Sequence, residues 1–189
     1  MNIQLAQKRD VQNFYNKIAR SYDELYGEEQ RKKFRLALNL GVFRFNGKIL
    51  DAGCGTGLFE AFLGKESKEC LIFGVDISRG VLDEAKKKFS GKPNIFLICG
   101  DIDYLPFPSS LFDSCVLFTV LQNLPKPEKT LDEIRRVVKK DALVVATYLK
   151  VKISLDKFRS LIGKAGFKGD VLDDPAVNEY IFVGRIKTS

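Results

Sequence analysis

The sequence predicts an α/β protein with a Rossmann-like, three-layer arrangement around a mostly parallel sheet, and three observations lead to this prediction. From residue 48 onward, short apolar runs alternate with helical patterns. A glycine-rich turn follows the first of these runs. Acidic residues end three consecutive predicted strands, which is typical of a sheet whose carboxyl edge binds a ligand.

Residues 1–45 are predicted to be helical. The apolar residues that share a helical face are Val11, Phe14, Tyr15 and Ile18 in a first segment, and Phe34, Ala37, Leu38, Gly41 and Val42 in a second. Asn46-Gly47 marks a turn. With no repeat or linker in the sequence, we expect one domain over residues 1–189, with a helical cap (1–45) on a core (46–189).

The core pattern predicts seven strands with helices between them. The predicted strands are 48–51, 70–75, 95–99, 114–118, 142–146, 167–172 and 180–184. Residues 58–63 suit a short helix, Ser78 caps the next, and Thr130-x-x-Glu133 has the form of a capping box. Ser154 is predicted to cap the last helix and Gly166 to close it.

Composition excludes several classes of protein. With 189 residues, 45% of them hydrophobic, the chain can bury a large core. No apolar run is long enough to span a membrane, and residues 1–10 lack the apolar segment of a secretory signal, so a cytoplasmic location is expected. The absence of histidine excludes Ser-His-Asp and Cys-His catalysis. Without histidine or a Cys-x-x-Cys pair, no metal site is expected.

The formal net charge is +7, from 31 basic and 24 acidic residues. A basic surface is compatible with nucleic acid or an anionic substrate. The basic clusters are equally compatible with solvated helix faces, which the pattern favours.

The strongest signal is the turn that begins at Asp51 and contains Gly53, Gly55 and Gly57, directly after a predicted strand. Such glycines let the backbone approach a ligand closely. Asp76 and Asp101 end the next two strands, and an acid at this position can bind both hydroxyls of a ribose. A dinucleotide fingerprint would need glycine where Leu58 stands. A ligand with a ribose, an adenine and an amino acid end fits better.

These features together resemble class I S-adenosylmethionine-dependent methyltransferases. The segments that carry the resemblance are 15–26, 49–57, 74–78, 100–107, 112–113, 131–138 and 165–167. The family's fold is a doubly wound, seven-stranded sheet whose last strand is antiparallel, which suits the final two strands predicted here. The resemblance implies S-adenosyl-L-methionine as cofactor.

The resemblance also implies which residues bind the cofactor: Tyr22, Asp51, Gly53, Cys54, Gly55, Gly57, Asp76, Ile77, Asp101, Ile102 and Phe118. Asp51 and the glycine-turn backbone would hold the amino acid end, and Asp76 the ribose hydroxyls. Asp101 would accept a hydrogen bond from the adenine amino group, while the Ile102 N–H meets a ring nitrogen. By the same resemblance Ile77 packs on adenine, Phe118 lines the methionine moiety and Tyr22 closes over the cofactor.

The methyl acceptor is less defined. The segment after residue 118 lacks the Asn/Asp-Pro-Pro-aromatic motif of relatives that methylate adenine or glutamine. Thr119, Gln122 and Asn123 are candidate substrate-binding residues and equally candidate loop hydrogen-bonders. The short cap favours a small-molecule substrate. The alternatives are RNA, such as tRNA, with or without a partner subunit, and a non-catalytic binding subunit of the same fold. A dinucleotide oxidoreductase is disfavoured by the glycine spacing.

Overall fold

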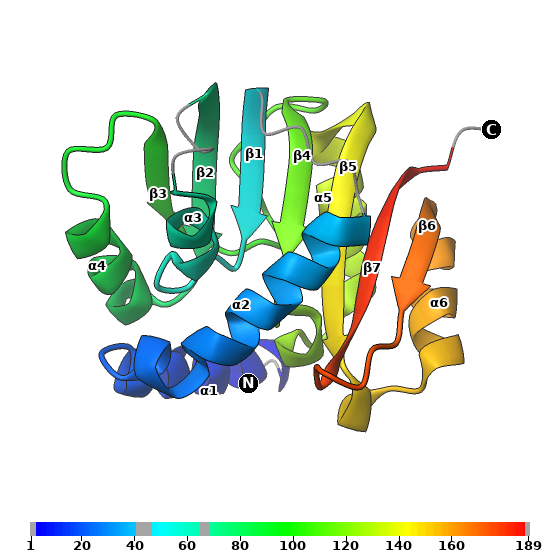
Figure 1. Cartoon of the computed structure of the whole chain (residues 1–189), viewed down its shortest axis with the longest axis horizontal. Helices are drawn as coiled ribbons and strands as arrows, with labels where there is room; N and C mark the ends of the chain where they lie inside the picture. The colour runs from blue at the N-terminus through cyan, green and yellow to red at the C-terminus, as the bar shows by residue number, and fades with distance from the viewer. Residues whose placement is uncertain (1–2, 41–46, 65–68, 188–189) are drawn as a thin grey trace.

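A computed structural model describes residues 3–40, 47–64 and 69–187, and its centre is a seven-stranded sheet (Figure 1). The strands are β1 (Gly47–Ala52), β2 (Cys70–Asp76), β3 (Ile95–Cys99), β4 (Phe112–Leu117), β5 (Val138–Leu149), β6 (Phe167–Leu172) and β7 (Glu179–Ile186). Their order is β3-β2-β1-β4-β5-β7-β6. Neighbouring strands are parallel except that β7 runs antiparallel to both β5 and β6. The predicted fold class is therefore confirmed.

Helices cover both faces of the sheet (Figure 1). They are α1 (Ile3–Ile18), α2 (Tyr22–Leu40), α3 (Leu58–Leu63), α4 (Arg79–Lys88), α5 (Pro127–Val137) and α6 (Leu155–Lys164). Because successive side chains of a strand point to opposite faces of the sheet, β1 contributes side chains to two hydrophobic cores. Ile49 packs with α2 and α3, and Leu50 packs with α5 and α6.

The two N-terminal helices differ in how they are attached. None of the residues of α1 is buried. In contrast, α2 buries Phe34 and Ala37 against α3 and β7. Within the described part of the predicted cap, residues 3–40, two helices are present as expected, whereas the predicted face positions Gly41 and Val42 and the turn at Asn46 lie outside the described residues.

Ser78 occupies the predicted N-cap position of α4 without a side-chain cap bond, and the capping box predicted at Thr130 is wrong. Ser78 precedes α4, but its side chain makes no cap hydrogen bond and instead lies 3.5 Å from the Gln12 carbonyl of α1. Thr130 lies inside α5, fully buried, and its hydroxyl bonds the carboxylate of Asp103. Glu133 accepts from the Leu105 N–H at 2.8 Å. In both cases a tertiary partner has replaced the local one.

The remaining element boundaries agree closely with the predicted ones. The Ser154 side chain caps α6 by accepting from the Lys157 N–H, and Gly166 follows that helix with a φ of 82°. β5 is longer than predicted, since it extends beyond 142–146 to residues 138–149. Within the described ranges, no helix has the length and hydropathy of a membrane span.

Candidate active site

The glycine turn leads from β1 into α3 with a backbone that favours glycine. Gly53, Gly55 and Gly57 have φ values of 87°, 55° and 77°. At Gly53 a Cβ atom would collide with the side chain of Val120, because the turn passes close to the segment after β4. At Gly55 nothing lies within 4 Å of the Cβ position, so this side of the turn is open to a ligand.

Asp76 stands at the end of β2 and faces the glycine turn. Its carboxylate accepts from the Gly55 N–H at 2.9 Å and from the Ser78 N–H at 2.8 Å. Burial raises the pKa of Asp76, and these backbone donors oppose the rise. The backbone N–H groups of Gly55, Ser78 and Ile77 thus face this carboxylate, whose two oxygens have about four lone-pair sites and so have room for a further donor.

Asp101, after β3, is held by a residue that the sequence analysis did not consider. The Lys8 ammonium of α1 lies 2.7 Å from both Asp101 oxygens and 2.5 Å from Asp103 Oδ2. Burial opposes the charge of Lys8, but the two carboxylates outweigh it and raise its pKa. The α1 helix is thus anchored at one of the strand ends predicted to bind adenine.

Asp51 is buried at the end of β1, near a second buried carboxyl group. Glu60, in the first turn of α3, is 1% exposed, and neither of its carboxylate oxygens has a partner among the described residues. Burial raises the pKa of Glu60 to about 7. Burial, followed by the negative charge of Glu60, also raises the pKa of Asp51 well above its ordinary value. Two buried carboxyl groups whose neutral forms are favoured by burial therefore lie beside the glycine turn.

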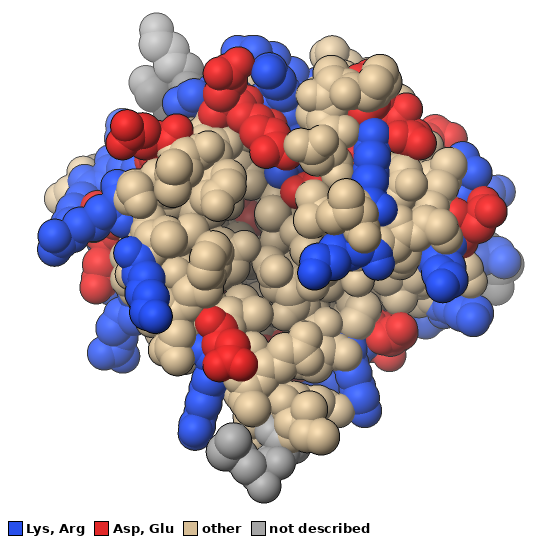
Figure 2. Space-filling model, turned by 90° about the horizontal axis from the view of Figure 1, so that it is seen from below, with Lys and Arg blue, Asp and Glu red and all other residues tan. Residues whose placement is uncertain are grey.

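A cavity lies between the carboxyl edge of the sheet and the two N-terminal helices. It holds about 730 Å³ of empty space, part of it open to solvent, and an adjoining space of about 320 Å³ shares part of its wall. Seen from this edge, the molecule is hollowed at its centre and the rim is largely uncharged, with Lys and Arg farther out (Figure 2). The size is that of a small-molecule site.

Most of the predicted cofactor residues line these two spaces. The residues on the larger space are Tyr22, Gly53, Gly55, Asp76, Ile77, Asp101, Ile102 and Phe118, and the smaller space adds Asp51 and Cys54. Gly57 lines neither and packs against Phe89. The buried Cys54 thiol has a raised pKa because it is desolvated.

The predicted acceptor residues are only partly brought together. Thr119 and Asn123 line the larger space, whereas Gln122 does not. The buried Oε1 of Gln122 has no partner in the described part of the chain.

Helices α1 and α2 form one wall of the cavity, and apart from Tyr22 the residues of this wall were not predicted from the sequence. Lys8, Val11 and Tyr15 of α1 line the larger space, and Gln30 of α2 lines the smaller. The helical spacing of Val11 and Tyr15 could have suggested a shared face, but not that this face meets a cavity.

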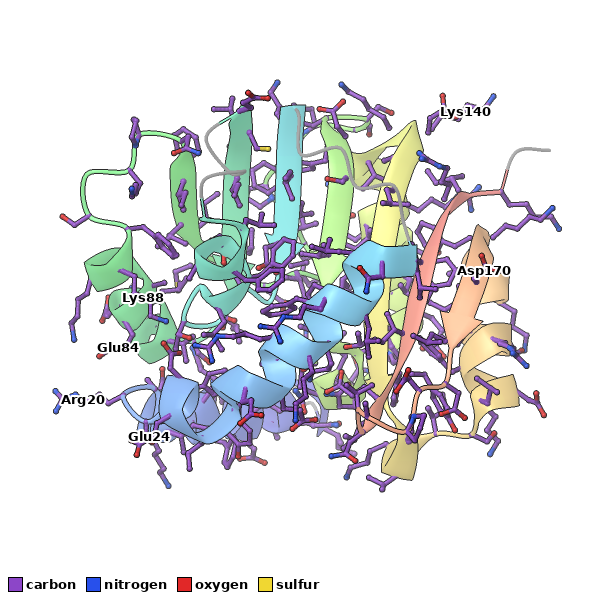
Figure 3. All side chains as sticks on the ribbon, viewed as in Figure 1. Arg20, Glu24, Glu84, Lys88, Lys140 and Asp170 are labelled. Carbon is purple, nitrogen blue, oxygen red and sulfur yellow. The ribbon has the colours of Figure 1, made fainter. Side chains whose placement is uncertain are left out.

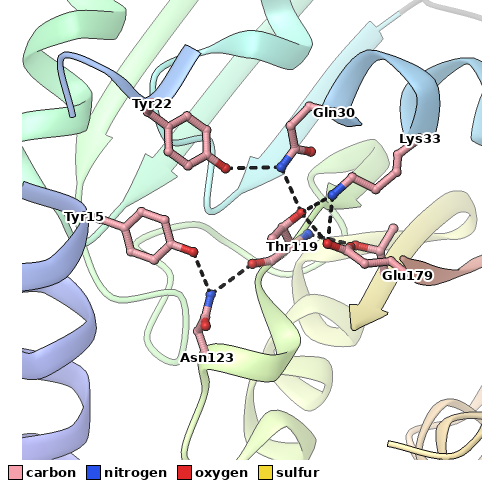
Figure 4. Close-up of polar contacts among 8 residues, drawn as sticks. Tyr15, Tyr22, Gln30, Lys33, Thr119, Asn123 and Glu179 are labelled. Atoms are coloured by element: carbon pink, nitrogen blue, oxygen red, sulfur yellow. Dashed lines mark hydrogen bonds and ion pairs between the residues drawn. The ribbon is translucent and has the colours of Figure 1, made fainter. Parts of the chain in front are cut away.

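A buried polar cluster stands behind this wall (Figure 4). Lys33 of α2 and Glu179 of β7 form an ion pair at 2.8 Å, with both side chains 2% exposed. The Thr119 hydroxyl lies 2.7 Å from the Lys33 ammonium and 2.9 Å from Glu179 Oε1. Gln30 and Tyr22 extend the cluster toward the cavity.

The glycine turn is also held from outside. Lys88 of α4, labelled in Figure 3, donates to the Thr56 carbonyl at 2.8 Å and pairs with Asp23 of α2. The Thr56 hydroxyl donates to the same aspartate. Two helices, α2 and α4, therefore fix the turn, consistent with a preorganised binding loop.

Comparison with known proteins agrees with this geometry. A family model described as a methyltransferase domain matches residues 50–146, which contain the glycine turn and all three strand-end acids. The chain belongs to this methyltransferase family. Its members of the class I fold use S-adenosylmethionine, so S-adenosylmethionine is the cofactor of this methyltransferase.

A curated relative and two solved structures illustrate the similarity. The chain is 33% identical over 146 residues to a demethylmenaquinone methyltransferase of Staphylococcus aureus, covering 74% of this chain and 60% of the relative. The chain therefore spans about 60% of the length of the curated relatives it matches.

Among solved structures, a SAM-dependent methyltransferase from Aquifex aeolicus superimposes with a TM-score of 0.76 at 18% identity, covering 90% of this chain and 98% of that one. A putative S-adenosyl-L-methionine-dependent methyltransferase from Methanococcus maripaludis gives 0.77 at 13% identity, covering 94% of both chains. At these identities the likeness is one of fold.

Proposed function

We propose that this methyltransferase transfers a methyl group from S-adenosylmethionine to a small-molecule acceptor. The observation that carries the proposal is the cavity between the strand-end acids and the cap, which joins a nucleoside-type site to a wall of tyrosines and apolar side chains. The curated relative, whose name gives demethylmenaquinone as its substrate, supports a small molecule rather than a macromolecule as the acceptor.

For the cofactor, we propose the roles that the strand ends suggest. Asp76 takes the ribose hydroxyls with its remaining lone pairs, and Asp51 faces the ammonium of the amino acid end. The open side of Gly55 admits the ligand close to the backbone. Asp101 and the Ile102 N–H bind the adenine. The adenine amino group must then share the Asp101 carboxylate with Lys8 or displace the Lys8 ammonium from it.

Apolar residues would position the rest of the cofactor. Ile77 lies on the adenine side of the larger space, and Phe118 lies on both spaces. The Phe118 ring is fixed by edge contact with Phe34, at 4.6 Å between centroids, so it offers a rigid wall to the methionine moiety. We propose residues 1–45 as the cap that closes this site over the core, within one domain.

Methyl transfer from a sulfonium needs little acid–base catalysis by the protein. The bound cofactor supplies an electrophilic methyl group on a sulfonium, and the departing thioether is neutral, so no general acid is needed. The residues of the cavity hold the acceptor in line with that group and exclude water. Such orientation can contribute roughly 7–11 kcal/mol to catalysis. A histidine-free site is compatible with this reaction.

Calorimetric titration with S-adenosylmethionine and S-adenosylhomocysteine tests the proposal first. We expect micromolar binding of both. Transfer of a labelled methyl group is then measured to a panel of hydroxylated aromatic compounds and, in parallel, to tRNA at two salt concentrations. Methylation of a small molecule supports the proposal. Transfer to tRNA with a steep salt dependence would replace it with the RNA alternative. Cofactor binding without any transfer would favour a binding subunit.

A further inference from the structure

The cavity wall contains one residue in an unusual backbone conformation. Thr119, directly after Phe118, has a φ of 62°, which is rare for a β-branched residue. Its N–H donates to Thr147 Oγ1 at 2.8 Å, and its carbonyl accepts from Asn123 Nδ2 at 3.0 Å. Hydrogen bonds at both the N–H and the carbonyl of Thr119 therefore hold this backbone conformation, and the side chain of Thr119 is fixed with it.

The Thr119 hydroxyl fixes the orientation of Gln30. The carboxylate of Glu179 can only accept, so the hydroxyl proton points to Glu179 Oε1 at 2.9 Å. The hydroxyl oxygen must then accept its other contacts. Gln30 therefore presents its Nε2 group, at 3.0 Å, since its carbonyl oxygen would face an oxygen without a proton.

This orientation determines the role of Tyr22. The same Nε2 group of Gln30 donates to the Tyr22 hydroxyl at 3.1 Å. Tyr22 is thus the acceptor in this bond, and its own proton is left for another partner. Among the described residues no acceptor receives it, and Tyr22 lines both spaces of the cavity (Figure 4).

Tyr15 is oriented in the same way from the other side of Thr119. Asn123 must present Nδ2 to the Thr119 carbonyl, because a carbonyl only accepts. The same Nδ2 group donates to the Tyr15 hydroxyl at 3.0 Å. The Tyr15 proton is therefore also without an acceptor among the described residues, and Tyr15 lines the larger space.

Two phenolic donors thus face one cavity, with their rings 6.0 Å apart. We propose that Tyr15 and Tyr22 form a two-donor site for a carbonyl or anionic oxygen of the methyl acceptor, such as an enolate or phenolate oxygen. The inference rests on the proposed function and names the class of its acceptor. Burial raises the pKa of both tyrosines, so both keep their protons at neutral pH and act as donors.

The position of Tyr15 favours the acceptor over the carboxylate of the cofactor. Tyr15 lines the larger space together with Asn123 and Leu124, but it does not line the smaller space, where Asp51 lies. Tyr22 stands between the two spaces. An oxygen held by both hydroxyls therefore lies in the larger space, away from Asp51 and beside the candidate acceptor residue Asn123. The two amides and Glu179 are positioning residues, because they act through the tyrosines.

A pair of probes of matched shape tests the site with S-adenosylhomocysteine bound at saturation. We expect 4-nitrophenol to bind with its pKa lowered, seen as increased phenolate absorbance, and 4-nitroaniline to bind at least about tenfold more weakly. Tyr15→Phe and Tyr22→Phe each weaken phenolate binding by about tenfold, and Tyr15→Phe does so while the affinity for S-adenosylhomocysteine is unchanged. Tyr26→Phe is the matched control, since Tyr26 packs on Tyr22 but does not line the cavity.

Substitution of Thr119 tests whether its hydroxyl fixes the amide orientation of Gln30. Thr119→Val keeps the shape but frees Gln30 to turn its carbonyl toward Tyr22, so the phenolate preference falls although both tyrosines remain. Thr119→Ser restores it. Equal binding of the two probes, binding of neither, or a preference that survives in Tyr15→Phe and Tyr22→Phe would overturn the proposal.

Binding of cofactor analogues distinguishes a role of the tyrosines at the acceptor from a role at the carboxylate of the cofactor. If Tyr22→Phe weakens S-adenosylhomocysteine but not 5′-methylthioadenosine, which lacks the amino acid end, the tyrosines serve the carboxylate of the cofactor and the proposal is wrong. Failure of the wild-type protein to bind S-adenosylhomocysteine contradicts the proposed function instead.

Discussion

The ammonium group of Lys8 lies 2.7 Å from both carboxylate oxygens of Asp101, although 93 residues separate them in sequence. Asp101 is also the carboxylate that we propose for the adenine amino group. On that proposal the same acid anchors α1 and binds the cofactor. We therefore expect cofactor affinity to depend on how firmly Lys8 holds Asp101.

Replacing Lys8 tests this competition. Lys8→Met frees Asp101, and we expect S-adenosylhomocysteine to bind roughly three- to fivefold more tightly, since a partly exposed ion pair contributes up to about 1 kcal/mol. Calorimetry measures the change. Arg9→Met, an exposed change of the same kind on the same helix, should leave the affinity unaltered. Weaker binding in Lys8→Met would mean that Lys8 supports the adenine site.

Asp76 offers the most direct test of the cofactor site. Asp76→Ala removes the acceptor proposed for the ribose hydroxyls, and each hydrogen bond to a charged group contributes about 1.5–3 kcal/mol. We expect S-adenosylhomocysteine affinity to fall by about 100-fold or more, with the melting temperature showing that the protein remains folded. Asp76→Asn retains one acceptor oxygen for the backbone and separates loop support from ligand binding. Unchanged affinity in both variants would contradict the assignment.

Glu60 should make stability depend on pH. Its pKa is about 7 in the folded protein and 4.5 ordinarily, so the unfolded chain releases this proton first as pH rises. The free energy of unfolding then falls between about pH 4.5 and pH 7 and levels off above, by up to roughly 3 kcal/mol.

Urea unfolding at pH 5 and pH 8 measures this fall. We expect a smaller fall in Glu60→Gln than in the wild type. Glu24→Gln, at an exposed position of α2, serves as the control and keeps the full fall. An identical pH dependence in Glu60→Gln would show that this group is not the source.

The buried pair of Lys33 and Glu179 should matter more when broken than when removed. Lys33→Met leaves the Glu179 carboxylate buried without its cation, which typically costs about 3–5 kcal/mol. Adding Glu179→Leu removes the stranded charge, so the double variant should recover most of the loss. A double-mutant cycle from urea unfolding checks this. Additive losses would show that the two residues act independently.

The part of the site that local sequence could predict is the part built from consecutive residues. The glycine turn and Asp76 follow strands whose apolar pattern is clear, and the parallel sheet brings such ends to one edge. Gln122 was expected at the substrate on the same basis, but the short helix Leu121–Asn123 carries it away from the cavity.

The contacts of the site that join segments far apart in the sequence could not be predicted from local sequence patterns. Lys33 and Glu179 are 146 residues apart, and their pairing depends on α2 crossing onto β7. The local pattern around Thr130 predicts a capping box, yet the buried carboxylate of Asp103 captures its hydroxyl. In each case the tertiary fold supplies a partner that sequence spacing cannot show.

The absence of any buried residue in α1 has a consequence for the behaviour of this helix in solution. Besides the contact of Tyr15 with the Tyr22 ring, its described attachments include polar contacts such as the bonds of Gln12 to the Ile77 carbonyl and of the Gly80 N–H to Asn16. Elements with few buried contacts open at low free energy. Amide protons of α1 should therefore exchange with deuterium sooner than those of α2, and a ligand that bridges the strand ends and α1 should slow that exchange.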